Sequence, residues 1–425
     1  MLRILFVHNN FPAQFARLSS TLAAMPDVDV RAIGSRTARP QQGVTLSRYR
    51  TPAGSPPTVH PFVRRFERDA RYGEEVLYAG LSLQDEGFEP DVVFVHPGWG
   101  EGLPLRLLFP HARIVVYAEF FYRAHGADLG FDDQYPPLGI DGLLRVEMRN
   151  ASQLLALCQS DAIVAPTLWQ KSLYPAEFRP SIDVIHDGID TRTARPDPKA
   201  QVQLPNGLQF SRADKLLTYV SRSLEPMRGF HVFLETLPEL LRLHPDLQVV
   251  VVGSDKTSYG AAPVGAPNWR DHYMRQLQGE IDPARLHFFP RLDYTVLLDL
   301  FRTTRVHFHY SYPFVLSWSL LEAMACGAVV VGSRTPPVEE VIEDGVNGYL
   351  RGFRDTPAAI ACISDILAQP QRHAAIGRNA RNSVVKRFDF ETVSKPACFA
   401  LLRRLGYEIP TQVTDRPVEQ GAIEP

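Results

Sequence analysis

The feature that most constrains this chain is a series of short apolar runs that alternate with longer segments of helical periodicity. The first set of runs covers residues 3–8, 28–34, 91–96, 113–118, 162–166 and 182–186, and the second covers 215–221, 248–253, 286–291, 305–311 and 328–333. Parallel strands have this pattern when helices cover both faces of their sheet. The sequence therefore predicts an α/β fold with two domains in series.

A polar, proline-containing segment separates the two sets of strands. Residues 191–206 (TRTARPDPKAQVQLPN) show neither strand nor helix periodicity, which is typical of a linker. The expected parts are an N-terminal Rossmann-like domain over 1–192, a linker over 193–206, a C-terminal Rossmann-like domain over 207–389, a helix over 390–409 and a loose tail over 410–425.

Composition and charge exclude several classes of protein. The 45 basic and 47 acidic residues balance, so no global electrostatic footprint for nucleic acid or an anionic membrane is present. The 4 cysteines form no CxxC pair, which argues against a disulfide framework or zinc site. The first apolar run is too short for a signal peptide, and no run reaches the length of a membrane-spanning helix. We expect a cytoplasmic protein that binds no nucleic acid.

The densest group of candidate residues lies at 310–331. A strand ends there, a helix begins near residue 317, and exposed N–H groups at a helix N-terminus favour a bound phosphate. The donor-side candidates in this first turn are Ser317, Trp318 and Ser319. Glu322 could accept hydrogen bonds from a ribose diol. Alternatively, the spacing of Ser319 and Glu322 matches a capping box, in which the glutamate only returns to the backbone.

A second group follows the first strand of the second domain. Arg222 and Arg228 flank a strand-to-helix loop, where two guanidiniums could hold a diphosphate and neutralise its charge as it departs. The alternative is that both are solvated surface arginines. Gly253 and Arg291 end the next two apolar runs and are further donor-side candidates.

Metal and nicotinamide sites are not expected. His307 and His309 alternate on one strand without a third ligand at a recognisable spacing, which favours histidines of the core. The acidic pairs at 27/29 and 132/133 superficially resemble a metal-binding Asp-x-Asp. The first opens a strand instead of ending one, and the arginines already offer neutralisation of a phosphate. The glycines within 98–102 lack the third glycine of a dinucleotide fingerprint.

The segments together resemble the family 4 retaining glycosyltransferases of the GT-B fold, over nearly the whole chain. Five stretches carry the resemblance: RILFVHNNFP (3–12), VIHDGID (184–190), the segment 222–229 with its two arginines, LLEAMACG (320–327) and EDGVNG (343–348). The resemblance implies two facing Rossmann-like domains with an interdomain cleft, and a C-terminal helix that packs back toward the first domain.

The same resemblance implies an activity. The chain would transfer a hexosyl or deoxyhexosyl group from a nucleotide-diphosphate sugar to a glycan, a lipid-linked glycan or a protein, with retention of configuration and without metal or another cofactor. In such a reaction the leaving phosphate would assist the attack. The alternatives are a nucleotide-sugar epimerase of the same architecture and a catalytically impaired nucleotide-sugar binding protein.

The resemblance also assigns roles in the second domain. Arg222 and Arg228 match the family's diphosphate-binding pair, and Glu322 matches its ribose-binding glutamate. Phe314 stands where the family usually has a second glutamate that contacts the donor sugar. Since a phenyl ring accepts no ordinary hydrogen bond, the donor is an unusual or deoxygenated sugar, the contact has moved to Ser317 or Ser319, or the protein is inactive.

The first domain supplies candidates of its own. Glu119 falls where many family members carry a donor-facing histidine, and its carboxylate could orient a hydroxyl or stabilise positive charge at the anomeric carbon. With Arg222 and Arg228 it completes the catalytic candidates. An ordinary structural hydrogen bond is the alternative. Candidates for the acceptor or sugar side are Asn10, His96, Trp99 and Glu101.

One charged segment bears on membrane contact. Residues 64–71 (RRFERDAR) form an amphipathic helical pattern rich in arginine, which could make a weak peripheral contact with anionic lipid at the inner face of the membrane. The acidic residues between the arginines favour a solvated face instead.

Overall fold

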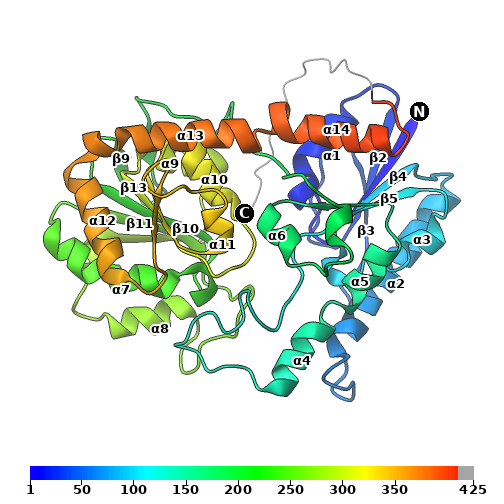
Figure 1. Cartoon of the computed structure of the whole chain (residues 1–425), viewed down its shortest axis with the longest axis horizontal. Coiled ribbons are helices and arrows are strands. Elements are labelled where there is room, and N and C mark those ends of the chain that lie inside the picture. The colour runs from blue at the N-terminus through cyan, green and yellow to red at the C-terminus, as the bar shows by residue number, and fades with distance from the viewer. Residues whose placement is uncertain (410–425) are drawn as a thin grey trace. The chain divides into compact units, whose positions relative to one another are not determined.

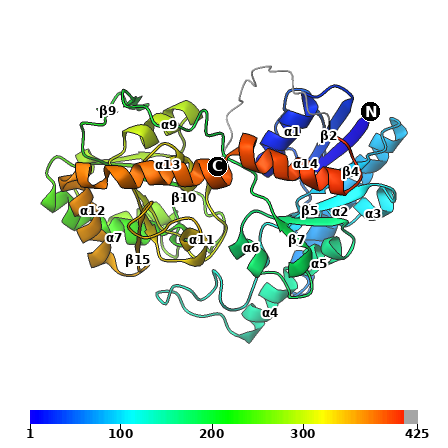
Figure 2. The same ribbon diagram turned by 45° about the horizontal axis from the view of Figure 1, so that its top comes forward.

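The computed structural model describes residues 1–409 and divides the chain into two compact units (Figures 1 and 2). Of the described residues, the first unit contains Met1–Gly188 and 390–409, and the second contains Ile189–Asp389. Within the described residues, no helix combines the length and the apolar character needed to cross a membrane.

The first unit is built on a parallel sheet of seven strands in the order β3-β2-β1-β4-β5-β6-β7. The strands are β1 (Leu2–Val7), β2 (Val28–Gly34), β3 (Thr45–Arg48), β4 (Val92–Val95), β5 (Arg113–Tyr117), β6 (Ala162–Ala165) and β7 (Ile182–Val184). The helices are α1 (Ala16–Ala23), α2 (Arg64–Asp85), α3 (Leu105–Leu108), α4 (Ile140–Met148), α5 (Ala151–Cys158), α6 (Leu168–Ser172) and α14 (Lys395–Arg404).

The C-terminal helix α14 packs beside α1 in the first unit (Figures 1 and 2). Leu401 and Leu402 are buried in one apolar cluster with residues of α1 and β1, among them Leu18 and Phe6. Burying two leucines stabilises the packing by a few kcal/mol. The chain therefore returns to the first sheet after building the second.

The second unit has a parallel sheet of six strands in the order β12-β11-β10-β13-β14-β15, and a small antiparallel pair β8-β9. The strands are β8 (Gln201–Gln203), β9 (Gln209–Ser211), β10 (Leu216–Ser223), β11 (Gln248–Ser254), β12 (Leu286–Phe289), β13 (Val306–His309), β14 (Val330–Ser333) and β15 (Tyr349–Arg351). The helices are α7 (Phe230–Leu243), α8 (Trp269–Gln276), α9 (Tyr294–Thr303), α10 (Trp318–Ala325), α11 (Pro336–Glu339), α12 (Thr356–Ala368) and α13 (Ala374–Phe388).

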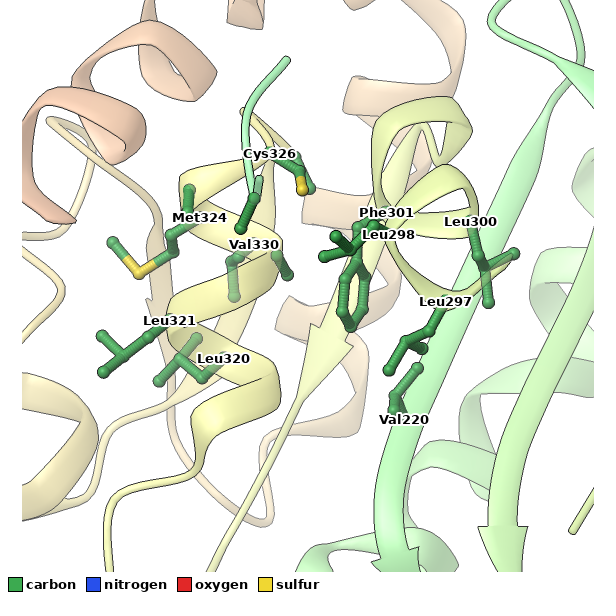
Figure 3. Close-up of a cluster of buried hydrophobic side chains, with 14 of the residues drawn as sticks. Val220, Leu297, Leu298, Leu300, Phe301, Leu320, Leu321, Met324, Cys326 and Val330 are labelled. Atoms are coloured by element: carbon green, nitrogen blue, oxygen red, sulfur yellow. The ribbon is translucent and has the colours of Figure 1, made fainter. Parts of the chain in front are cut away.

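Helix α10 is held in place by the core of the second unit. Among the side chains that Figure 3 labels, Leu297, Leu298, Leu300 and Phe301 belong to α9, and Leu320, Leu321 and Met324 belong to α10. They lie in the same apolar cluster as Cys326 at the end of α10, Val220 of β10 and Val330 of β14. This packing leaves α10 little freedom to move relative to the sheet. The position of its N-terminus is thereby fixed.

Both sheets reverse direction at a comparable place. In the first sheet β1 lies between β2 and β4, and in the second β10 lies between β11 and β13. The chain adds strands on one side of β1 or β10 first and then on the other side. The place where this order reverses is the switch point, and open parallel sheets bind ligands there, beyond the carboxyl ends of their strands. Each unit thus has one preferred place for a site.

The structure corrects the expected boundaries. The first unit ends at Gly188 instead of residue 192, and the segment 193–206 is not a linker, because it contains β8 and joins the second unit. Val202 and Leu204 lie in the core of that unit at 0% and 2% exposure. The alternating pattern of β8, QVQ, is too short to be distinguished from a polar loop in the sequence.

Two further strands escaped the sequence analysis for similar reasons. Both β3 and β15 are short edge strands, and few of their residues are fully buried. The expected tail over 410–425 lies outside the described residues.

The corrected segment gives a direct test by unfolding. Leu204 is 2% exposed and Leu208, on the same hairpin, is 37% exposed. We expect Leu204→Ala to lower the free energy of unfolding by about 2–5 kcal/mol because it leaves a core cavity. Leu208→Ala, the matched control, should change it by at most about 0.5 kcal/mol. Equal effects of the two substitutions in urea denaturation would contradict the packing of this segment.

Candidate functional site

The predicted donor-side residues of the second unit gather at the switch point of its sheet. Arg222 lies near the end of β10, and Arg228 ends the single 3₁₀ turn (Pro226–Arg228) before α7. The loop after the neighbouring strand β13 leads to Ser317, at which α10 begins. The parallel pairing of β10 with β13 therefore brings both predicted segments to one edge of the sheet.

The two arginines differ in their surroundings. Arg222 is exposed, whereas Arg228 is only 8% exposed. The guanidinium of Arg228 lies near the rings of Tyr259 and Phe314, with its central carbon 5.3 Å and 5.4 Å from their centroids. Its Nε has no hydrogen-bond partner in the described part of the chain. A buried cation of this kind attracts an anion strongly, because little water screens it.

No side chain caps the N-terminus of α10. Ser317 has extended backbone geometry. Its hydroxyl pairs with that of Ser319 at 2.8 Å. The uncapped N–H groups and the positive end of the helix dipole favour a phosphate here.

Glu322 does not form the capping box that its spacing allowed. Its Oε1 accepts a hydrogen bond from the hydroxyl of Tyr294 at 2.9 Å, and the residue is 8% exposed. Tyr294 belongs to α9, so the carboxylate is oriented by a neighbouring helix rather than by its own. A carboxylate held in this way can still accept hydrogen bonds from a vicinal diol.

Of the two other predicted donor-side residues, Gly253 lies on β11 beside β10, whereas Arg291 does not join this group. Gly253 is explained by packing, since a Cβ there would lie 2.6 Å from Cδ2 of Leu224 and 3.0 Å from the carbonyl oxygen of Ser221. Arg291 is exposed and follows β12, which β11 separates from β10. The sequence placed both residues at strand ends but could not show that β11 adjoins β10 and that β12 does not.

Phe314 has a structural role that the sequence did not indicate. Its ring is 3% exposed and meets the ring of Tyr259 at a centroid distance of 4.8 Å. Tyr259 and Glu225 were not predicted as site residues, and Tyr259 lies in no recognisable motif. The only available signal was the position of Glu225 between the two arginines.

A second group of polar residues lies at the switch point of the first sheet. His8 follows β1, His96 follows β4, and Glu119 lies two residues beyond β5. Hydrogen bonds join them in a chain through Gln14: His8 Nε2 to Gln14 Oε1 at 2.9 Å, Gln14 Nε2 to Glu119 Oε1 at 2.5 Å, and His96 Nε2 to Glu119 Oε2 at 3.1 Å. Loops from three strands therefore meet at one carboxylate.

Backbone hydrogen bonds indicate the tautomer of both histidines. Nδ1 of His8 accepts from the N–H of Asn10 at 2.9 Å, and Nδ1 of His96 accepts from the N–H of Gly98 at 3.2 Å. A backbone N–H can only donate, so each ring carries its proton on Nε2. His96 thus donates to Glu119, and His8 donates to Gln14.

The carboxylate of Glu119 is held in its ionised form. Burial would raise its pKa, but hydrogen bonds from His96 and Gln14 outweigh that effect, so the pKa of Glu119 lies below its usual value. Its side chain remains 24% exposed. Glu119 can therefore act as a fixed negative charge and hydrogen-bond acceptor.

Aromatic rings flank this carboxylate. The ring of His96 lies 4.9 Å from that of His8 and 4.8 Å from that of Trp99, between their centroids. Trp99 and Asn10 are half-buried. An aromatic face beside amide and carboxylate groups is a common arrangement for binding a polyhydroxylated ligand. The structure brings four of the predicted first-domain residues together: Asn10, His96, Trp99 and Glu119.

Glu101 is the exception. It is 0% exposed and accepts a hydrogen bond from the hydroxyl of Tyr49 at 2.6 Å. Burial, opposed by the Tyr49 hydrogen bond and assisted by the charge of Asp69, raises the pKa of Glu101 to about 8. Glu101 is therefore a core residue that is neutral below about pH 8, and it does not face an acceptor.

The predicted core histidines are buried in the second sheet. His307 is 0% exposed, and its Nδ1 lies 3.0 Å from the hydroxyl oxygen of Thr218. Burial lowers the pKa of His307 to about 3, and that of its neighbour His309 also lies well below the usual value. Within residues 1–409, no three His, Cys, Asp or Glu side chains gather as a metal site.

Comparison with known proteins covers both units. The model of a family described as "Glycosyl transferase family 4 group" matches residues 26–194, and that of "Glycosyl transferases group 1" matches residues 205–383. A GDP-mannose-dependent alpha-(1-6)-phosphatidylinositol monomannoside mannosyltransferase of Mycolicibacterium smegmatis is 25% identical over 69% of this chain and 72% of its own. A D-inositol 3-phosphate glycosyltransferase of Mycobacterium marinum is 28% identical over 44% of this chain, but only 37% of its own length is covered.

Solved structures resemble the fold along its whole length. Sucrose-phosphate synthase of Thermosynechococcus elongatus superposes with a TM-score of 0.71 at 16% identity, over 95% of this chain and 99% of that one. HepE of Anabaena, crystallised with UDP-glucose, gives 0.64 at 15% identity, over 95% and 100%. Two Rossmann-like units of this kind define the GT-B fold class.

The buried carboxyl of Glu101 gives a test by pH. Its folded-state pKa of about 8 lies above the ordinary 4.5, so the stability that its protonated form contributes is complete below about pH 4.5 and is lost as the pH rises to about 8. Glu101→Gln keeps a neutral acceptor for Tyr49. We expect wild type to lose about 2 kcal/mol of unfolding free energy relative to this variant between about pH 6 and 8. Parallel pH profiles in urea denaturation would show that Glu101 is not held protonated.

Proposed function

Because the chain belongs to the family 4, group 1 glycosyltransferases, we propose that it transfers a hexosyl or deoxyhexosyl group from a nucleoside-diphosphate sugar to an acceptor hydroxyl, with retention of configuration and without a metal ion. The observation that carries the donor half of this proposal is the buried guanidinium of Arg228, which lies near Phe314 in the loop that leads to the uncapped N-terminus of α10. Glycosyl transfer itself follows from family membership.

The second unit would bind the donor. As the bond from the anomeric carbon to the phosphate oxygen breaks, negative charge builds up on the diphosphate. Arg222, Arg228 and the N–H groups of α10 would stabilise that charge, while Glu322 would hold the ribose. Fixed positive groups can supply the neutralisation that a divalent cation supplies in other transferases. The residues present therefore support a metal-independent reaction.

Retention follows from attack on the face that the diphosphate leaves. The acceptor oxygen forms its bond to the anomeric carbon on that face, and its proton passes to the departing phosphate oxygen. The donor diphosphate thereby serves as its own base. Family membership supports this route, and it assigns no proton transfer to Glu119.

The first unit would bind the acceptor. Glu119, ionised and partly exposed, can orient a hydroxyl, and Trp99 offers an apolar face to a sugar or polyol.

The names of two relatives contain an inositol compound, and one of these names gives GDP-mannose as the donor. A glycan, a lipid-linked glycan or a protein-bound sugar presents the same hydroxyl chemistry. We place this reaction in the cytoplasm, with no nucleic acid as partner.

The donor site can be tested without knowing the acceptor. We expect one of UDP, GDP, ADP and dTDP to raise the melting temperature of the protein clearly, because a ligand that binds only the folded state stabilises it. Arg228→Ala should weaken that nucleotide's affinity about 30-fold or more, since it removes a charge-assisted hydrogen bond. Arg291→Ala, which removes an exposed arginine outside the group, serves as control. Unchanged affinity in Arg228→Ala, measured by calorimetry, would refute the donor site.

Glu322 has a separate signature. We expect Glu322→Gln to weaken binding of the nucleoside diphosphate about tenfold while leaving the affinity for inorganic pyrophosphate unchanged, because the carboxylate would contact ribose and not phosphate. Competition with the matching 2′,3′-dideoxynucleotide provides the control. If Glu322→Gln weakened both ligands equally, the assigned ribose contact would be wrong.

A further inference from the structure

The guanidinium of Arg228 sits in a corner formed by two rings. The centroids of Tyr259 and Phe314 lie 5.3 Å and 5.4 Å from its central carbon, and the two ring planes meet at 61°. Phe314 is fixed in the core at 3% exposure, whereas Tyr259 is 37% exposed. The ring of Phe314 thus belongs to the core, and the ring of Tyr259 belongs to a surface segment.

The surface segment that carries Tyr259 is hydrogen-bonded to the loop that carries Arg228. Tyr259 lies between β11 and α8, and the N–H groups of Ser258, Tyr259 and Gly260 all approach Oε2 of Glu225 at 3.3, 3.3 and 3.4 Å. Glu225 is 1% exposed and lies three residues before Arg228. Successive N–H groups that converge on one oxygen form an anion-binding nest. Here the anion is the protein's own carboxylate.

We propose that Tyr259 and Phe314 are positioning residues that hold the guanidinium of Arg228 for the donor diphosphate, and that Glu225 holds Tyr259 in place. This inference rests on the proposed role of Arg228 in donor binding. The residues act through Arg228 and need make no contact with the donor sugar.

The physical advantage lies in how the rings engage a guanidinium. Aromatic rings interact with its faces through cation–π contacts, while its N–H groups point outward in the plane and remain available to a phosphate. The rings also exclude water, which strengthens attraction between the cation and an anion. An arginine fixed in one rotamer loses less entropy when the ligand binds.

This role gives a reason for the phenyl ring at position 314. A phenyl ring there gives Arg228 an aromatic neighbour and adds no negative charge beside it.

The test measures affinity for the nucleoside diphosphate that stabilises the full-length protein most, by titration calorimetry. We expect Tyr259→Leu to raise its Kd about tenfold, the size of a partly desolvated cation–π contact. Tyr259→Phe, which keeps the ring, should restore the wild-type Kd. Tyr78→Leu, at a tyrosine that is 61% exposed on α2, controls for loss of an aromatic side chain elsewhere.

A double-mutant cycle shows whether the ring acts through Arg228. In an Arg228→Ala background, we expect Tyr259→Leu to change Kd by less than about twofold, because the residue on which the ring acts is gone. Glu225→Ala should resemble Tyr259→Leu, and Glu225→Gln, which keeps an acceptor oxygen for the loop, should restore binding.

The outcomes separate this inference from the proposed function. If Arg228→Ala loses affinity but Tyr259→Leu binds as wild type does, the positioning role is wrong and the donor site stands. The positioning role is also wrong, with the donor site intact, if Tyr259→Leu weakens binding equally with and without Arg228. If Arg228→Ala itself binds normally, both the donor site and the positioning role are wrong.

Discussion

The second unit depends on a buried positive charge that no carboxylate of the described chain neutralises through an ion pair. Arg228 is 8% exposed, and placing a cation in such surroundings costs free energy unless a partner compensates for it. Two aromatic rings provide part of that compensation, and the remaining attraction is available to an anion. The sheet order, the turn before α7 and the packing of α10 all serve to place this charge near the loop that leads to a helix N-terminus.

The first unit uses the opposite charge at the same topological place. Hydrogen bonds from a histidine and an amide hold Glu119 at the switch point of the other sheet, with a pKa below its usual value. One unit therefore offers positive groups suited to a leaving diphosphate, and the other offers an acceptor of hydrogen bonds suited to hydroxyl groups. This division of labour agrees with a transferase that handles one anionic and one polyhydroxylated substrate.

Much of the fold could be predicted from the sequence. The apolar runs indicated eleven of the strands, because buried parallel strands are continuous hydrophobic stretches. Arg222, Arg228 and Glu322 stood out because they occur in motifs that follow strands. The sequence did not indicate the edge strands β3 and β15 or the hairpin at 201–211, because short half-exposed strands carry little periodic signal.

The parts of the site that the sequence could not predict depend on tertiary packing. Glu101 is buried and Glu119 is partly exposed. The local sequence does not distinguish them, because both follow strands of the same sheet. The partner of Glu322 lies on α9, and the Tyr259 ring near Arg228 belongs to a loop whose N–H groups bond to Glu225. Such pairings join residues far apart in the chain.

The most direct measurement is a crystal structure of the full-length protein with its preferred nucleoside diphosphate. The account predicts phosphate oxygens at about 2.7–3.0 Å from the guanidinium of Arg228 and from the first N–H groups of α10. A diphosphate bound elsewhere, with Arg228 still without an anion, would contradict the central claim.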